Sequence, residues 1–325
     1  MSVGGPRLEP PAGGIGFLGA PVHPDAATVD ADLAVLGVPF GVPYDMRGVA
    51  SGASEAPEAV RASAARLAPF LDHHDFDVGG PLLGDPPLRL VDCGNVPGNP
   101  RDLDGNAARA TEAVRAVLDR GAVPIVLGGD DSVPILVLRA YARHGPVHVV
   151  QIDAHLDFRD EVRSVREGYS SPMRRASEMD HVARVVHVGQ RGVGALRPQD
   201  VADTLAAGNA IVTAREVREA GPKAVLRHLP EGSASFVTLD CDGLDPAVMP
   251  GTSAPMPGGL SFDEAAGILG GLAPRCRVVG MDVVEHYPSL DVNGITSLAV
   301  VRLIANLVGG MARGARANLT PPWHP

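Results

Sequence analysis

Acidic residues come directly after three apolar segments of this sequence, and their spacing predicts a shared site. Residues 128–132 read GGDDS after VPIVL, residues 153–157 read DAHLD after VHVVQI, and residues 240–246 read DCDGLDP after SFVTL. In an extended segment, every second side chain points to the same side. We therefore expect one shared side within each of the last two segments, for Asp153, His155 and Asp157, and for Asp240 and Asp242.

The chemistry that suits such a cluster is metal binding. Several carboxylates in one place repel one another strongly unless cations lie between them. Carboxylate oxygens with one imidazole suit a hard or borderline ion such as manganese. This set is too large for one ion. Ligands that bridge two ions would accommodate it, so the pattern favours two divalent metal ions that share and activate one water. For Asp160 or Asp245 alone, capping of the next helix is the preferred interpretation.

The elements that must position these residues are an alternation of short apolar strands and amphipathic helices. Such a rhythm is typical of a three-layer α/β/α sandwich with a mostly parallel sheet, here of about eight strands. In such sheets, ligands bind beyond the carboxyl ends of the strands, where the acidic segments lie. We expect strands at 33–38, 88–92, 123–127, 147–152, 184–188, 210–213, 235–239 and 277–284, and helices at 55–67, 105–119, 132–143, 199–206, 262–272 and 296–308.

Composition limits the classes of function. Of the 325 residues, 45% are apolar, which is the share of an ordinary globular protein. The net charge of -10 argues against nucleic acid, which needs a basic surface. No segment reads as a secretory signal or a membrane span, and three scattered cysteines suit a reduced compartment, so we expect a cytoplasmic protein. We expect one domain at 31–315, an irregular segment at 1–30 and a short tail at 316–325.

These motifs resemble those of the ureohydrolases, the family of arginases and agmatinases. That family carries Gly-Gly-Asp-His-Ser, Asp-Ala-His-x-Asp and Ser-x-Asp-x-Asp-x-x-Asp-Pro, and this sequence has GGDDS, DAHLD and TLDCDGLDP at the matching places. Segments 51–61 (SGASEAPEAVR) and 281–297 (MDVVEHYPSLDVNGITS) are also similar to family segments. The resemblance implies an eight-stranded parallel sheet between helices. It also implies a hydroxide that bridges two metal ions and attacks a guanidino carbon, releasing urea and an amine.

The resemblance implies roles for individual residues. Asp153 and Asp240 would bridge the ions, His155 and Asp242 would complete one of them, and Asp157 would serve the other. Glu285 would hold the guanidinium nitrogens of a small guanidino substrate, which is natural for a planar carboxylate. Tyr44, Asp45 and Arg47 follow the first strand, and we expect them at the mouth of the site. The family commonly forms trimers and hexamers, so a homo-oligomer is expected.

Two positions depart from the family pattern. Asp131 stands where the first motif has a metal-binding histidine, which adds negative charge and moves the preference further toward manganese or magnesium. Asp131 would either bind the first ion or release it. Segment 167–179 (EGYSSPMRRASEM) lacks the histidine that is thought to move protons in the family. The substitutes available are Tyr169, Ser170, Ser171 and His286, and His286 is more easily explained as structural.

The remaining polar candidates are better explained without a role in catalysis. His73 and His74 precede a strand, so a surface position is expected, and Arg174 and Arg175 suit salt bridges. The main hypothesis is an agmatinase-like hydrolase of C–N bonds in linear amidines. One alternative is a weak or inactive homologue with a structural or ligand-binding role, and another is hydrolysis of a different C–N bond. Loops 160–172 and 247–257 would shape the substrate site.

Overall fold

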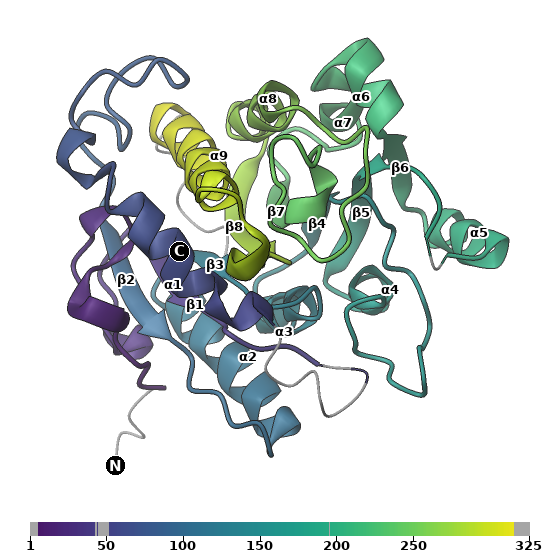
Figure 1. The fold of residues 1–325 in the computed structure, drawn as a ribbon, viewed down its shortest axis with the longest axis horizontal. Coiled ribbons are helices and arrows are strands. Elements are labelled where there is room, and N and C mark those ends of the chain that lie inside the picture. Colours follow the sequence, from purple (N-terminus) through teal and green to yellow (C-terminus); the bar gives the residue numbers. More distant parts are fainter. Residues whose placement is uncertain (1–5, 43, 45–51, 195, 315–325) are drawn as a thin grey trace.

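One parallel sheet organises the molecule (Figure 1). The computed structural model describes residues 6–42, 44, 52–194 and 196–314. The sheet has 8 strands in the order β2-β1-β3-β8-β7-β4-β5-β6, and neighbouring strands are parallel. The strands are β1 Leu33–Gly37, β2 Leu90–Asn95, β3 Val123–Leu127, β4 Val147–Ile152, β5 Val182–Gln190, β6 Ala210–Thr213, β7 Ala234–Asp240 and β8 Arg277–Val284.

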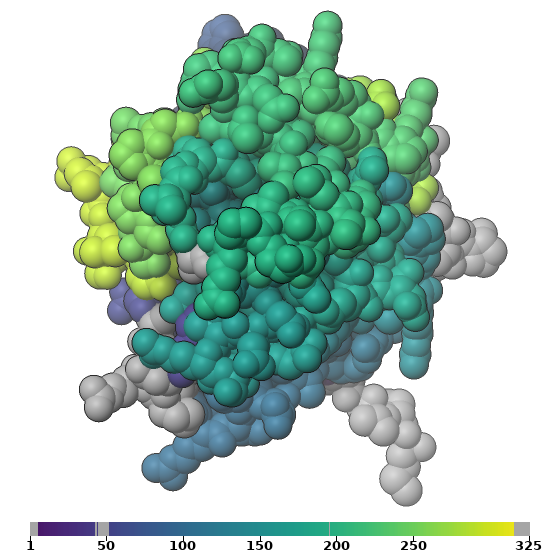
Figure 2. Space-filling model, turned by 90° about the vertical axis from the view of Figure 1, so that its right-hand side faces the viewer, coloured from purple at the N-terminus to yellow at the C-terminus, as the bar shows by residue number. Residues whose placement is uncertain are grey.

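Helices cover both faces of this sheet, which confirms the three-layer expectation. One core cluster joins one sheet face to α1, α6, α7, α8 and α9, and a second joins the other face to α2, α3 and α4. Helix α5 lies beside β6 at the edge, on the side that Figure 2 views. The helices are α1 Ala56–Ala64, α2 Leu103–Asp119, α3 Val133–Arg139, α4 Pro172–Ser177, α5 Pro198–Ala206, α6 Ala214–Ala220, α7 Lys223–Leu226, α8 Phe262–Leu272 and α9 Ile295–Arg313.

The strands are apolar on both faces because both faces are covered. Strands β1, β3 and β7 are buried at every position. Helix starts are fixed by local polar pairs, as where Thr213 and Glu216 form a capping box at α6 and Ser261 and Glu264 form one at α8. Helix α9 is long and apolar enough to cross a bilayer, but 72% of its most apolar stretch of 18 residues is buried in the fold, as expected of a core helix.

The eight expected strands are all present, and the six expected helices correspond to α1, α2, α3, α5, α8 and α9. The sequence patterns missed α4, α6 and α7, which have six, seven and four residues. Helices this short do not complete two turns, so they produce no amphipathic period. The described part of the N-terminal segment contains short 3-10 turns and an antiparallel bridge between Arg7 and Asp25.

Candidate active site

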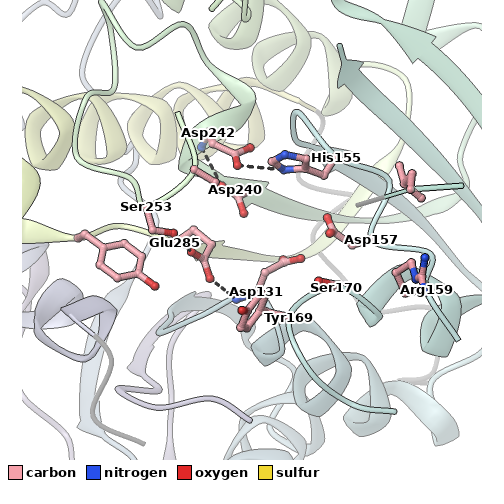
Figure 3. Close-up of a pocket in the computed structure, with 13 residues that line it drawn as sticks. Asp131, His155, Asp157, Arg159, Tyr169, Ser170, Asp240, Asp242, Ser253 and Glu285 are labelled. Atoms are coloured by element: carbon pink, nitrogen blue, oxygen red, sulfur yellow. Dashed lines mark hydrogen bonds and ion pairs between the residues drawn. The ribbon is translucent and has the colours of Figure 1, made fainter. Parts of the chain in front are cut away.

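Four neighbouring strands deliver the acidic residues to one edge of the sheet. Strands β3, β8, β7 and β4 are consecutive in the sheet, and their carboxyl ends therefore lie next to one another. Asp131 follows β3, Glu285 follows β8, and Asp240 ends β7. Each chain segment leaves the sheet into a loop or helix at this edge, so its polar side chains converge without having to enter the apolar layers (Figure 3).

The acidic side chains form two overlapping groups of potential ligand atoms. In the first group, atoms of Asp153, His155 and Asp242 all lie within 4.8 Å of one another. In the second, the same holds for Asp131, Asp153 and Asp240. Asp153 belongs to both groups. Two cations placed in these groups would therefore share one carboxylate, which is the arrangement that bridging requires.

The convergence does not arise from strand alternation, contrary to expectation. Strand β4 ends at Ile152 and residues 153–155 form a bend, while Asp242 lies in a 3-10 turn after Asp240. Asp157 has a positive φ of 44°, in the left-handed region that non-glycine residues rarely adopt. The residues between these ligand candidates, Ala154, Leu156 and Cys241, are buried. Tight turns, rather than extended chain, aim the ligands.

Hydrogen bonds from the backbone fix the carboxylates. The Asp242 amide donates to Asp240 (2.7 Å), and the Ala154 amide donates to Asp242 (3.0 Å). The His155 amide donates to Asp153 (2.6 Å), and Nδ1 of the His155 ring lies 3.1 Å from an Asp242 oxygen. These contacts orient the oxygens before any cation binds.

The carboxylates of the cluster lie so close together that added positive charge would stabilise them. Burial, followed by repulsion from the neighbouring carboxylates, holds the pKa of Asp131 and Asp240 well above the ordinary value. Burial and the charge of Asp153 do the same to the pKa of Asp157. Hydrogen bonds to Asp153 and Asp242 raise the pKa of His155 to about 11. The carboxylates thus draw in whatever cation is available.

Glu285 stands beside this cluster and is held from two sides. One carboxylate oxygen accepts from the Asp131 amide (2.9 Å), and the other accepts from the Ser253 hydroxyl (3.1 Å). Burial is the first cause that raises the pKa of Glu285 to about 8. Its φ of 58° is again left-handed. Such backbone strain, here at both Asp157 and Glu285, is concentrated at functional sites in proteins.

A row of buried polar residues beneath the cluster was missed from the sequence. The strand register places His187, Gln151, Thr238 and Asp282 side by side across β5, β4, β7 and β8. The Gln151 amide donates to Asp153 (2.7 Å) and to Asp157 (3.2 Å), and its oxygen contacts His187 Nδ1 (2.5 Å). Gln151, contacted by His187, therefore supports two of these carboxylates from within the sheet.

A cavity of about 440 Å³ opens over the cluster (Figure 3). Ser170, Ser253 and Ala254 line it, so both predicted loops contribute. Its described lining comprises Asp131, His155, Asp157, Arg159, Tyr169, Ser170, Leu196, Asp240, Asp242, Ser253, Ala254, Glu285 and Tyr287. Arg159, Leu196 and Tyr287 were not anticipated, because loop residues that are remote in sequence carry no periodic signal.

Tyr44 is absent from the described lining of this cavity, and its expected place at the mouth stays a prediction. Its hydroxyl instead accepts from the Ser170 amide (2.8 Å), and its ring lies 4.3 Å from the Tyr169 ring between centroids. Tyr44 therefore braces two residues that do line the cavity. Asp45 and Arg47 lie outside the described residues.

The other polar candidates have structural partners, as expected. His286 is buried between Ser297 (2.8 Å) and the Gly251 carbonyl (3.3 Å). Asp160 pairs with Arg175 (2.8 Å), which makes it an ion-pair partner rather than the helix cap expected for it. Arg174 pairs with Glu178 and Asp203. His73 is exposed next to Asp72, at a distance from the cavity lining.

Comparison with known proteins agrees with the resemblance in the motifs. A family model described as the arginase family matches residues 31–309. A guanidinopropionase of Pseudomonas aeruginosa is 31% identical over 307 residues, which cover 92% of each chain. The mitochondrial agmatinase of Gallus gallus is 30% identical over 305 residues, covering 92% of this chain and 86% of its own. The structure of proclavaminate amidino hydrolase from Streptomyces clavuligerus aligns with a TM-score of 0.81 at 29% identity, over 92% of this chain and 97% of that one. With this fold and these motifs, the chain belongs to the arginase family.

Proposed function

We propose that this chain is a metal-dependent amidinohydrolase that converts a linear guanidino compound to urea and an amine, closer to the agmatinases than to the arginases. The observation that carries the proposal is the pair of overlapping ligand groups that share Asp153, with Glu285 in the same cavity. A guanidinium needs a planar carboxylate partner, and its carbon needs an activated water. Both requirements meet within one site here.

The residues present fit two divalent cations. An oxygen of Asp131 is buried without a hydrogen-bond partner among the described residues, although a buried carboxylate oxygen needs one. Oxygen donors with one imidazole favour Mn2+, our proposed metal. We assign Asp153 and Asp240 as bridging ligands, His155 and Asp242 to one ion, and Asp131 and Asp157 to the other. Asp153 alone belongs to both compact groups, so the bridging role of Asp240 and the assignment of Asp157, which is in neither group, rest on the family resemblance.

The cations supply Lewis acidity that lowers the pKa of water at the cluster. The chain's own residues do the rest. Glu285, held by the Asp131 amide and Ser253, accepts hydrogen bonds from the guanidinium and fixes its plane. Asp157, which lines the cavity beside the cluster, is our candidate for receiving a proton there. Ser170 and Tyr169 line the same cavity and would contact the substrate.

Urea release tests the proposal directly. The manganese-loaded protein would be assayed with arginine, agmatine, guanidinopropionate, guanidinobutyrate and guanidine. We expect release from at least one of them, and a loss of about 10–100-fold in kcat/KM in the Glu285→Gln variant, because a charge-assisted hydrogen bond to a cation is removed. Glu161→Gln is the matched control, since that glutamate does not line the cavity. No urea from any substrate, with the metal bound, would favour the inactive-homologue alternative or another C–N bond.

Location and assembly are also part of the proposal. Cys93, Cys241 and Cys276 are free and buried, which supports a reducing compartment and hence the cytoplasm. We propose a homo-oligomer, a trimer or hexamer, on the resemblance to the family. Light scattering on the purified chain checks this, and a monomeric mass would contradict it.

A further inference from the structure

Arg159 places a positive charge in a cavity that also holds the acidic cluster. Among the described residues that line the cavity, it is the one arginine or lysine, and every other ionisable side chain there is acidic, a tyrosine or His155. It lies with Ser170 on the side of the cavity opposite Glu285 and Ser253 (Figure 3). A substrate that places its guanidinium against Glu285 therefore extends toward a cation.

The Arg159 side chain is held in place rather than mobile. Its Nη1 lies 3.4 Å from an Asp200 oxygen, and only 16% of the side chain is exposed. Its backbone amide donates to the Ser170 carbonyl (3.0 Å), which closes the 160–170 loop at its base. Asp200 is anchored in turn by the Arg197 amide (2.8 Å) at the start of α5. A fixed guanidinium orients a ligand at little entropic cost.

Asp200 does not cancel this positive charge for a ligand in the cavity. Asp200 is absent from the cavity lining, whereas Arg159 is part of it, so a ligand meets the guanidinium first. A guanidinium has five N–H donors and binds more than one carboxylate. An ammonium tail would face a like charge at short range, while a carboxylate tail would form a charge-assisted pair. Tyr169 and Leu196 supply apolar surface for the methylenes between the two ends.

We propose that the preferred substrate is a guanidino acid, with a carboxylate at the end opposite the guanidinium, and that Arg159 selects it over the amine-tailed agmatine. This inference rests on the proposed function, which it narrows to one class of tail. Similarity does not decide the point, since the relatives include both a guanidinopropionase and an agmatinase. The positive charge of Arg159 in the cavity wall is the feature that favours a carboxylate tail.

The test uses substrates of equal reach that differ in tail charge: 4-guanidinobutyrate, agmatine and uncharged butylguanidine. Steady-state urea release would be measured for the manganese-loaded protein and for Arg159→Met, which keeps the length and removes the charge. We expect kcat/KM for guanidinobutyrate to exceed that for agmatine by at least about tenfold, and Arg159→Met to lower the former by about 10–100-fold, mainly through KM. Butylguanidine should change by less than about threefold, because it lacks the group that Arg159 recognises.

Arg166→Met is the matched control. Arg166 sits on the same loop, is 56% exposed and pairs with Asp160 and Glu178 outside the cavity lining, so this variant should behave as the parent. A parent enzyme that prefers agmatine would overturn the inference. So would an Arg159→Met variant that loses activity equally on all three substrates, which would mean a purely structural role.

Failure of the proposed function remains distinguishable. If none of the substrates releases urea, titration calorimetry of the manganese-loaded protein with the same three compounds decides the inference alone. Tighter binding of guanidinobutyrate than of agmatine, lost in Arg159→Met and kept in Arg166→Met, would support it. Equal binding of both compounds, or no effect of Arg159→Met, would overturn it.

Discussion

Asp131 shows how one side chain decides the character of the centre. It reaches the second ligand group from β3, next to Asp153 and Asp240. An aspartate in place of an imidazole adds a negative charge to a cluster whose carboxylates already raise one another's pKa. The position suits a small, hard cation better than a histidine would. The open question from the sequence was whether Asp131 binds or releases its ion, and its unpartnered buried oxygen favours binding.

We therefore expect Asp131→Asn to reduce the bound manganese from about two ions per chain to about one, because one amide replaces a charged ligand. Asp131→His should retain about two, since imidazole also binds manganese. Elemental analysis after dialysis gives the stoichiometry, and manganese paramagnetic resonance reports whether the ions interact. Asp160→Asn is the control, as this carboxylate pairs with Arg175 on the surface. Full occupancy in Asp131→Asn would show that Asp131 is no ligand.

At the scale of elements, the strands of the sheet do more than carry ligands at their ends. Gln151 lies in β4, inside the sheet, and its side-chain amide donates hydrogen bonds to both Asp153 and Asp157. His187 in β5 contacts the Gln151 oxygen and thereby fixes the way the amide points. Partners behind metal ligands orient those ligands and tune their affinity. The sheet thus positions the centre through side chains as well as through strand order.

Removal of this support should weaken metal binding without touching a ligand. We expect Gln151→Leu to weaken manganese affinity by about 10–100-fold, as is usual for such partners. Calorimetric titration of the metal-free protein with manganese measures it. Gln199→Leu is the matched control, since Gln199 is an exposed residue of α5 that donates to Asp203. A folded Gln151→Leu protein with unchanged affinity would contradict this role.

Asp282 lies in the same row, and we expect it to make the stability of the fold depend on pH. It is fully buried, and burial raises its pKa to about 8. The unfolded chain has an ordinary pKa of about 3.9, so between these values the native state holds a proton that the unfolded state releases. The contribution of this group to the free energy of unfolding is therefore greatest below about pH 4. It falls by up to about 1.4 kcal/mol per pH unit until about pH 8.

Asp282→Asn should abolish this dependence, because an amide carries no titrating proton. Urea unfolding of parent and variant would be compared at pH 5 and pH 8 without metal. Relative to that of the parent, the free energy of unfolding of the variant should rise by up to roughly 4 kcal/mol between pH 5 and pH 8. Asp245→Asn serves as the control, since Asp245 is a loop carboxylate with a lowered pKa. A difference that stays constant with pH would mean that Asp282 does not titrate in this range.

The sequence predicts the elements better than the details of the site. Strands buried on both faces leave continuous apolar runs, so all eight were predictable. The carboxylates were recognisable because they follow those runs directly. Gln151 and Asp282 were hidden because each is one polar residue inside an apolar run, which by itself reads as a tolerated exception. Arg159 and Tyr287 join the cavity only through the folding of remote loops, which no local pattern records.

At the scale of the whole molecule, the cluster lies at the middle of the sheet. The proposed ligands follow β3, β4 and β7, which together with β8 form the middle of the sheet. Without cations, their carboxylates repel one another, and this repulsion opposes folding. With cations, the same residues tie distant parts of the chain together. Metal binding should therefore stabilise the fold globally rather than one loop.

The two effects have opposite signs, and one substitution separates them. Manganese at about 100 times its dissociation constant should add about 2.7 kcal/mol per independent site to the free energy of unfolding, visible as a higher Tm in calorimetry and reversed by a chelator. Asp240→Asn should raise the Tm of the metal-free protein, because one repelling charge is removed, and should shrink the increment from manganese, because one ligand is lost. Asp263→Asn, a surface change at the start of α8, should alter neither. If Asp240→Asn lowered the metal-free Tm, the carboxylates would be held together by contacts that outweigh their repulsion, and the cluster would be a structural network before it is a metal centre.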